Sequence, residues 1–140
     1  MKRIILFLPR RLAKMDCYKD VGMFLYSLAN KFGWEATLAV LGDFEHNESF
    51  EKYCKVVSIG DMKSTEDERI EVINDFIKHN IENYDVAMFF NYGSKNYRFA
   101  YLCKKYNTKI KVVCKLDMSD DGFSHFDEKT FLRKIKNRFE

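Results

Sequence analysis

Apolar and polar residues follow one another along the chain in two distinct patterns, and each pattern predicts one type of element. Several short runs are almost wholly apolar and lack the alternation of a half-exposed strand. Such runs are typical of strands that are buried on both faces of a parallel sheet. We expect strands at residues 3–8, 35–41, 55–59, 84–90 and 109–116. Pro9 ends the first run, because proline has no N–H group to donate to a sheet.

Elsewhere apolar residues recur every three or four positions, which is the spacing of one helix face. The clearest case begins at Asp20, whose carboxylate we expect to cap the helix, and ends at Gly33. Further helices are expected after the hydroxyl and acidic residues 64–68, from about 97 to 107 and from about 127 to the end, with an irregular loop at 42–51. Strands that alternate with helices pair in parallel through right-handed crossovers. The sequence therefore predicts a single α/β domain over residues 1–140: a Rossmann-like three-layer sandwich with a mostly parallel sheet of about five strands.

The composition narrows the classes of protein to consider. Apolar residues make up 46% of the chain and aromatic residues 16%, so an intrinsically disordered chain is excluded. A net charge of +3, evenly spread, does not indicate nucleic acid as a partner. The four cysteines form no CxxC pair, which favours reduced, packed thiols of a cytoplasmic protein over a disulfide framework or a zinc site. No apolar stretch approaches the roughly 20 residues of a membrane span, and the N-terminal run is too short for a signal peptide.

Ligands of open parallel sheets bind outside the carboxyl ends of the strands. In this chain the predicted strand ends carry Arg10, Asn91, Tyr92, Lys115 and Asp117. The loop after the first strand has neither GxGxxG nor GxxxxGK[ST], which disfavours a dinucleotide or a P-loop nucleotide. The next helix begins with Asp20, Val21 and Gly22, where free N–H groups would point at a ligand. Gly22 permits either the close approach of that ligand or closer helix–strand packing, and the sequence leaves both options open.

Other residues of catalytic type give weaker signals. His46, His79 and His125 have no nucleophile paired with them and are interpreted as surface residues. Asp117, Asp120 and Asp121 offer the oxygen ligands that a cation prefers, but a solvated turn is the favoured interpretation and no metal site is predicted. Asp117 is not expected to be the phospho-acceptor of a response regulator, because the loop after the first strand lacks the acidic pair of that family.

Two basic features near the C-terminus need an explanation. Lys115 lies at the end of a buried strand, and its ammonium group must reach water or a carboxylate. Asp117 is one candidate partner, although neighbours in a strand point to opposite faces and such a contact is unfavourable. Residues 131–139 carry apolar positions at helical spacing with basic residues between them. Their basic face is either solvated, which we favour, or a peripheral contact with anionic lipid at the inner face of the cell membrane.

Three parts of the sequence together resemble one family. They are residues 4–10 (IILFLPR), residues 18–41 (YKDVGMFLYSLANKFGWEATLAVL), and residues 84–90 with 112–118 (YDVAMFF and VVCKLDM). They resemble the N-terminal domain of bacterial GT-B glycosyltransferases of the group-1 kind, which build capsule and other surface polysaccharides. The resemblance covers nearly the whole chain, but its motifs are not catalytic signatures.

The resemblance implies two Rossmann-like domains across a cleft, with the acceptor on the N-terminal domain and the nucleotide-sugar on the C-terminal one. It places at the cleft the residues Asp20, Val21, Gly22, Asn91, Tyr92, Lys115 and Asp117. The nucleotide-sugar is a substrate, and no other cofactor is implied. Asn91-Tyr92 stands where the family often has a histidine, and the chain ends before the E-x7-E pair of the donor domain, so no catalytic base is assigned.

The chain ends at Glu140, directly after an amphipathic segment that lacks a C-cap. We therefore expect a donor-binding domain to be supplied in cis, by a longer chain, or in trans, by a second subunit. On this hypothesis the 140 residues bind a glycan or lipid-linked acceptor and are inactive alone. The alternative, from another class, is a stand-alone Rossmann-like binding module without catalytic activity.

Overall fold

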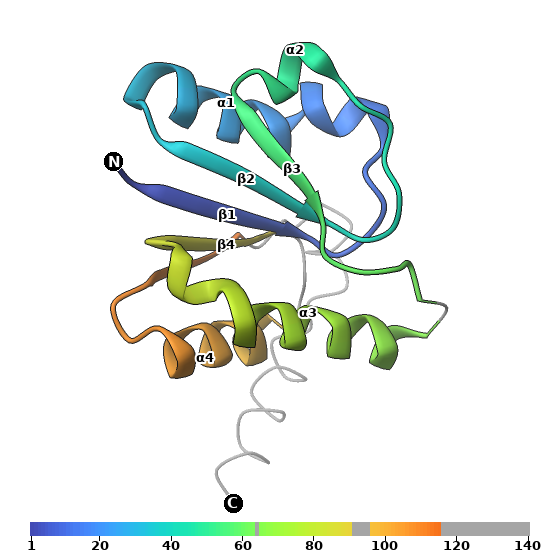
Figure 1. The fold of residues 1–140 in the computed structure, drawn as a ribbon, viewed down its shortest axis with the longest axis vertical. Coiled ribbons are helices and arrows are strands. Elements are labelled where there is room, and N and C mark those ends of the chain that lie inside the picture. The colour runs from blue at the N-terminus through green and yellow to red at the C-terminus, as the bar shows by residue number, and fades with distance from the viewer. Residues whose placement is uncertain (64, 91–95, 116–140) are drawn as a thin grey trace, which may run out of the picture.

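The protein forms a five-stranded sheet in which every strand pairs in parallel with its neighbours, in the order β3-β2-β1-β4-β5 (Figure 1). This computed structural model describes residues 1–63, 65–90 and 96–115. The strands are β1 (Arg3–Leu8), β2 (Glu35–Val40), β3 (Cys54–Ser58), β4 (Val86–Phe90) and β5 (Lys111–Lys115). The predicted α/β, Rossmann-like class is confirmed, and each strand lies within two residues of its predicted bounds.

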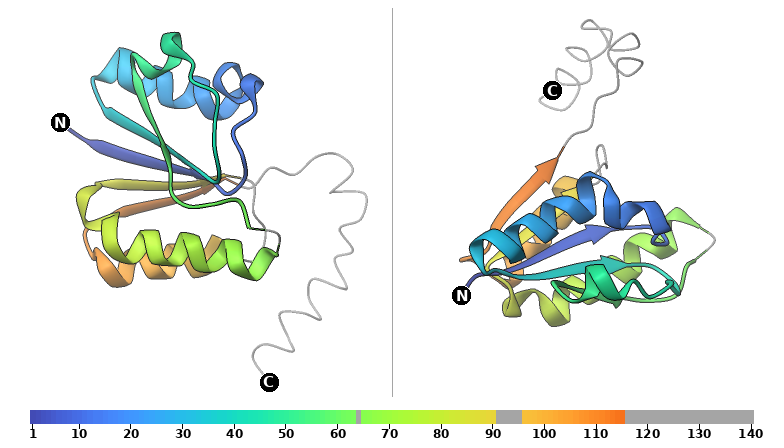
Figure 2. Two further views of the ribbon diagram at one scale, coloured as in Figure 1. Left: turned by 45° about the vertical axis from the view of Figure 1, so that its right-hand side comes forward. Right: turned by 90° about the horizontal axis from the view of Figure 1, so that it is seen from above.

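Helices cover both faces of the sheet. They are α1 (Asp20–Phe32), α2 (Glu48–Glu51), α3 (Glu66–Asn80) and α4 (Asn96–Tyr106), with two short 3-10 helices, η1 (Lys14–Tyr18) and η2 (Ile81–Asn83). Figures 1 and 2 show α1 and α2 on one face and α3 and α4 on the other. The prediction of an irregular loop over residues 42–51 is wrong for its last part, which forms the one-turn helix α2. Asn47 caps this helix, because its side-chain oxygen accepts a 3.1 Å hydrogen bond from the Phe50 N–H.

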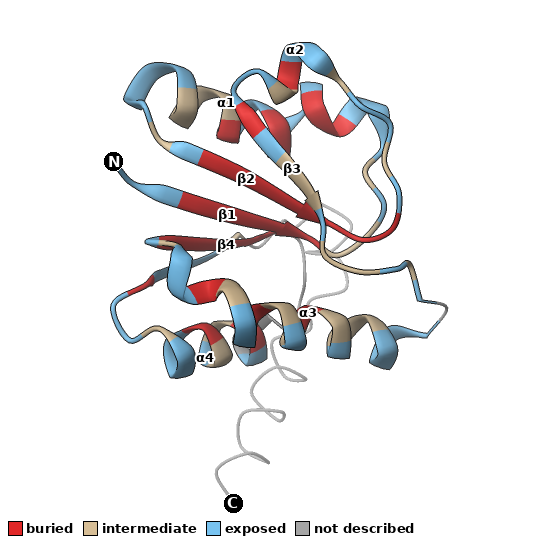
Figure 3. Ribbon diagram, viewed as in Figure 1, coloured by how far each residue is buried: buried red, intermediate tan, exposed pale blue. Residues whose placement is uncertain are grey.

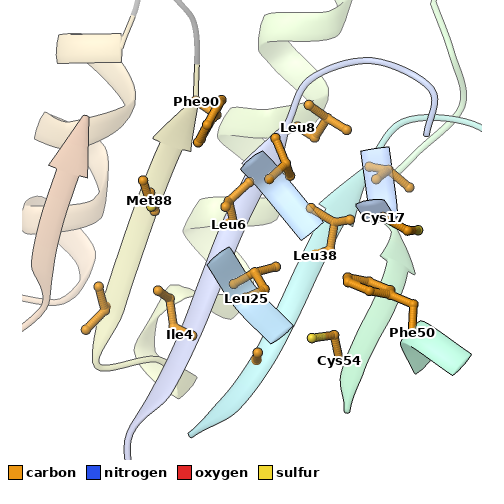
Figure 4. Close-up of a cluster of buried hydrophobic side chains, with 14 residues drawn as sticks. Ile4, Leu6, Leu8, Cys17, Leu25, Leu38, Phe50, Cys54, Met88 and Phe90 are labelled. Carbon is orange, nitrogen blue, oxygen red and sulfur yellow. The ribbon is translucent and has the colours of Figure 1, made fainter. Parts of the chain in front are cut away.

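Alternate residues of each central strand enter two separate cores, which explains why the strand sequences are apolar throughout. Ile4, Leu6 and Leu8 of β1 belong to the cluster beneath α1 (Figure 4), while Ile5 and Phe7 belong to the cluster beneath α3 and α4. In the second cluster the Phe7 and Phe89 rings stack with centroids 4.8 Å apart. Figure 3 shows β1, β2 and β4 as buried strands and the outer strand β3 as only partly so.

Two of three predicted helix ends follow local rules. Gly33 ends α1 in the left-handed conformation, with φ 64°, and Thr65 forms a capping box with Glu68 at the start of α3. The predicted cap of α1 is wrong. Lys19 occupies the N-cap without a side-chain bond, and Asp20 is the first helical residue. A tertiary contact explains the difference: the Asp20 carboxylate contacts Lys115 instead of the backbone N–H groups of its own first helical turn.

Several predictions lie outside the described residues. They concern the turn that contains Asn91 and Tyr92, the acidic segment that contains Asp117, and the C-terminal helix at 127–140. Within the described residues, no helix is long and apolar enough to cross a membrane.

Candidate functional site

The strand order places a topological switch point between β1 and β4. The chain proceeds outward from β1 to β2 and β3, and then returns to β4 on the other side of β1. Loops that follow these two strands therefore diverge, and in sheets of this kind the ligand-binding crevice is expected at the carboxyl edge of this point. The loop after β1 and the first turn of α1 border that edge on one side, and the ends of β4 and β5 border it on the other.

The loop after β1 is held by a two-bond fork between Arg10 and Asp16. Arg10 Nη1 donates to Asp16 Oδ2 at 2.7 Å, and Nη2 donates to Oδ1 at 2.8 Å. The Ala13 N–H donates to the same Oδ2 at 2.7 Å, which fixes the turn that leads into η1. Asp16 is only 6% exposed. The hydrogen bond from Arg10, and after it the one from the Ala13 N–H, hold the pKa of the Asp16 carboxyl below its ordinary value. Burial acts in the opposite direction but does not outweigh them. Arg10, predicted as a cleft residue, is thus a structural partner of Asp16.

Gly22 serves packing. A Cβ built at this position would lie 2.5 Å from both the Cα and the carbonyl oxygen of Cys17, and 2.6 Å from the carbonyl oxygen of Asp16. The backbone of η1 therefore rests against the first turn of α1 where only glycine leaves room. The sequence left open whether Gly22 makes room for a ligand or for packing of the helix against a strand. In the structure it makes room for the backbone of η1. Val21, beside it, is buried in the core beneath α1.

Asp20 and Lys115 meet at the crevice. Lys115 Nζ lies 3.1 Å from Asp20 Oδ2 and 4.2 Å from the centroid of the Phe90 ring. The ion pair joins the end of β5 to the start of α1, and the ring at the end of β4 supports the ammonium group. The lysine side chain is 35% exposed and the aspartate side chain 71%. Both charged groups therefore remain accessible to a ligand in solvent.

The structure brings some predicted site residues together and separates others. Asp20 and Lys115 form one pair, Arg10 is bonded to Asp16, and Val21 and Gly22 lie in the packing beneath them. Asn91, Tyr92 and Asp117 lie outside the described residues. Sequence reasoning missed Asp16. The only signal was an isolated acid within the basic loop after the first strand, where an ion pair with a nearby arginine is expected.

A small hollow of about 300 Å³ adjoins this loop, between η1 and the segment before α2. Asn47 Nδ2 donates to Tyr18 Oη at 3.0 Å across it, and His46 Nδ1 lies 3.0 Å from Glu51 Oε1. His46 is exposed, with 76% of its side chain accessible, and His79 is exposed on α3. The surface interpretation of these two histidines is confirmed, while His125 lies outside the described residues.

The three buried cysteines are unsuited to nucleophilic chemistry. All four cysteines are free thiols; Cys17, Cys54 and Cys103 are buried, as predicted for packed residues, whereas Cys114 is exposed. Burial raises the pKa of Cys54 and of Cys103 to about 12, so neither forms a thiolate near neutral pH. Among the described residues, no group of three or more histidine, cysteine or acidic side chains is placed to hold a metal ion.

The fold and this crevice define an α/β protein of the Rossmann-like class, with an accessible ion pair at the carboxyl edge of the sheet. Comparison with protein-family models finds no family that matches the chain. Comparison with curated proteins also finds no match. The function must therefore be argued from the geometry of the site and the chemistry of its side chains.

Proposed function

We propose that this chain is the acceptor-side domain of a GT-B glycosyltransferase, which transfers a sugar from a nucleotide-sugar to a glycan or lipid-linked acceptor in the synthesis of a surface polysaccharide. The parallel sheet with its switch point at β1 and β4 is compatible with this role. The observation that carries the proposal is the accessible Asp20–Lys115 pair at the carboxyl edge.

The two charged groups suit the two parts of a lipid-linked acceptor. The Asp20 carboxylate can accept hydrogen bonds from sugar hydroxyls, and the Lys115 ammonium can donate to a phosphate that links the sugar to its lipid. The Arg10–Asp16 fork holds the neighbouring loop in place, so the acceptor meets a preformed surface.

Catalysis on this proposal needs a second domain. No catalytic base is assigned to this chain, and its proposed contribution is to orient the acceptor. Stabilisation of the nucleotide-diphosphate leaving group is assigned to a donor-binding domain in cis or in trans. Membrane contact by the basic residues 131–139 remains part of the proposal for a lipid-linked acceptor.

The first test is a binding titration of the 140-residue chain followed by NMR. The probes are short-chain prenyl-diphosphate sugars and free oligosaccharides, with UDP-glucose and GDP-mannose for comparison. We expect an acceptor to shift the amide signals at the start of α1 and the end of β5. D20N and K115M should each weaken binding roughly tenfold. The control K111M, which changes an exposed lysine at the opposite end of β5, should leave it unchanged.

The result that would overturn this proposal is saturable binding of a nucleotide-sugar at the carboxyl edge, with no response to any acceptor. The alternative is a stand-alone binding module without catalysis, which could bind a ligand at the same edge. Co-expression with a donor-binding domain encoded downstream, or in a neighbouring frame, separates the two. Sugar transfer to the acceptor supports the glycosyltransferase, and no transfer with any partner supports the module.

A further inference from the structure

A second polar site lies at the opposite edge of the sheet, where the strands begin. A groove of about 580 Å³ opens there. The residues on which the argument rests are Arg3 of β1, Glu35 and Thr37 of β2, Lys55 of β3, Asn83 of η2 and the adjoining Tyr84. None of these residues contributes to the crevice at the carboxyl edge. The groove is therefore separate from the site proposed for the acceptor.

The strand register fixes the floor of the groove. Ile5 pairs with Thr37, and Thr37 pairs with Lys55, so these three residues form one row across β1, β2 and β3. Arg3 pairs with Glu35 in the row before it. Since Ile5 belongs to the core beneath α3 and α4, both rows lie on that face of the sheet. Adjacent strands lie about 4.8 Å apart, so a ligand of a few ångströms would contact several side chains at once.

Thr37 is the observation that indicates a ligand. It is only 7% exposed, lies within a strand whose other inward positions are apolar, and lines the groove. Its hydroxyl makes no hydrogen bond to any residue in the described part of the chain. The residue is nearly buried, but its hydroxyl oxygen is not among the fully buried unpaired atoms, so it reaches the solvent of the groove. The hydroxyl is therefore available to a molecule that enters the groove.

The charged residues of the floor are also uncommitted. The side chains of Arg3, Lys55 and Glu35 form no ion pair with any residue that the structure describes. Two cations thus stand beside one carboxylate, one hydroxyl and the amide of Asn83. Two positive groups select an anion, while a carboxylate and a hydroxyl bond to the hydroxyl groups of the same ligand. The half-buried Tyr84 adds an aromatic side chain to the wall.

We propose that this groove binds an anionic sugar, a hexose unit that carries a phosphate or a carboxylate group. Arg3 and Lys55 bind the anionic group, and Thr37, Glu35 and Asn83 bond to the ring hydroxyls. The volume of the groove falls within the range of small-molecule sites, about 300–1,000 Å³. The inference does not depend on the proposed glycosyltransferase activity, because it concerns the other edge of the sheet.

The test is calorimetry and NMR on the full chain with a panel of hexose 6-phosphates and hexuronic acids, with glucose and inorganic phosphate as the two partial ligands. We expect saturable binding of at least one anionic sugar, with shifts at Thr37, Lys55 and Asn83. Glucose or phosphate alone should bind at least about tenfold more weakly. Preference for the phosphates or for the uronic acids tells which anionic group the site takes.

Single-residue variants distinguish a specific binding site from nonspecific attraction between the anion and the positive charges of the surface. K55Q should weaken binding roughly tenfold and T37V by roughly threefold or more. K111Q, which removes an exposed lysine from the same edge but outside this groove, should leave the affinity unchanged. T37V should also leave the stability unchanged or raise it, since no protein hydrogen bond is removed.

Three results would overturn the inference: no binding by any member of the panel, equal binding of inorganic phosphate and the sugars, or equal losses in K55Q and K111Q. A T37V protein that is destabilised would show that the hydroxyl has a structural role. None of these results bears on the test with D20N and K115M at the opposite edge, so the two proposals fail independently.

Discussion

Lys115 Nζ lies 3.1 Å from Asp20 Oδ2, and the two residues are 95 positions apart in the sequence. The contact joins the outer strand β5 to the first turn of α1, across the edge where the strands end. Asp20 also lies in the first turn of a helix, where a negative charge interacts favourably with the helix dipole. One carboxylate therefore serves two electrostatic interactions, and its position at the crevice is set by both.

The Asp20–Lys115 pair should contribute little to global stability. Both side chains are partly exposed, and exposed ion pairs contribute about 0–1 kcal/mol. We expect D20N and K115M each to lower the free energy of unfolding by less than about 1 kcal/mol, with a coupling of roughly 0.5 kcal/mol in a double-mutant cycle. Urea denaturation at low and high salt measures both. A coupling above about 2 kcal/mol that persists in high salt would contradict this account of a solvent-screened pair.

Gly22 should tolerate no side chain. In G22A the new methyl group would overlap the backbone of η1, which cannot move as a flexible side chain would. We expect a loss of about 2–3 kcal/mol in the free energy of unfolding. G33A is the matched control, since Gly33 has φ 64° but nothing within 4 Å of an added Cβ, and it should cost only about 1 kcal/mol. Equal losses in chemical denaturation would mean that η1 shifts to accommodate the methyl group.

The pattern of apolar and polar residues was sufficient to predict the strands and the long helices, but it did not predict the short helices. The strands and the helices α1, α3 and α4 follow from apolar runs and helical spacing, because each buries one or two faces in a core. The one-turn helices α2 and η1 have too few residues for periodicity. They depend on individual hydrogen bonds, such as those accepted by the side chains of Asn47 and Asp16, and a sequence pattern does not reveal these bonds.

The candidate site shows the same limit for charged residues. The position of Asp20 at the start of α1 was predictable, because helix starts favour acids, but its partner was not, since Lys115 is distant in sequence. Arg10 was predicted to face a ligand because it follows a buried strand. Its guanidinium instead bonds Asp16, six residues later, and no periodic pattern distinguishes that outcome from exposure to a ligand.

The four cysteines should differ sharply in reactivity. Cys114 is exposed, while Cys17, Cys54 and Cys103 are buried. Burial raises the pKa of all four thiols, so accessibility is what distinguishes Cys114. We expect an aromatic disulfide reagent to modify one thiol per chain in the native protein and all four after unfolding. C114S should abolish the native reaction, and C54S should leave it unchanged. Fast modification of a second thiol in native C114S would show that one of the buried thiols is accessible.

The Asp16 carboxylate should make stability depend on pH in the acid range. Its folded pKa is lowered, chiefly by the bond from Arg10, relative to an unfolded pKa of about 3.9. The carboxylate therefore contributes its full stabilisation above about pH 5, and this contribution is lost as the pH falls through the unfolded and then the folded pKa. At pH 7 we expect D16N to lower the free energy of unfolding by about 2 kcal/mol, because the fork to Arg10 loses its charge. The difference between wild type and D16N should shrink as the pH is lowered from 5 to 2 in urea titrations. D43N, at an exposed aspartate, should show neither the loss at pH 7 nor the narrowing. A wild-type-to-D16N difference that stays constant down to pH 2 would mean that the folded pKa of Asp16 is not lowered and that its ion pair with Arg10 is not a source of stability.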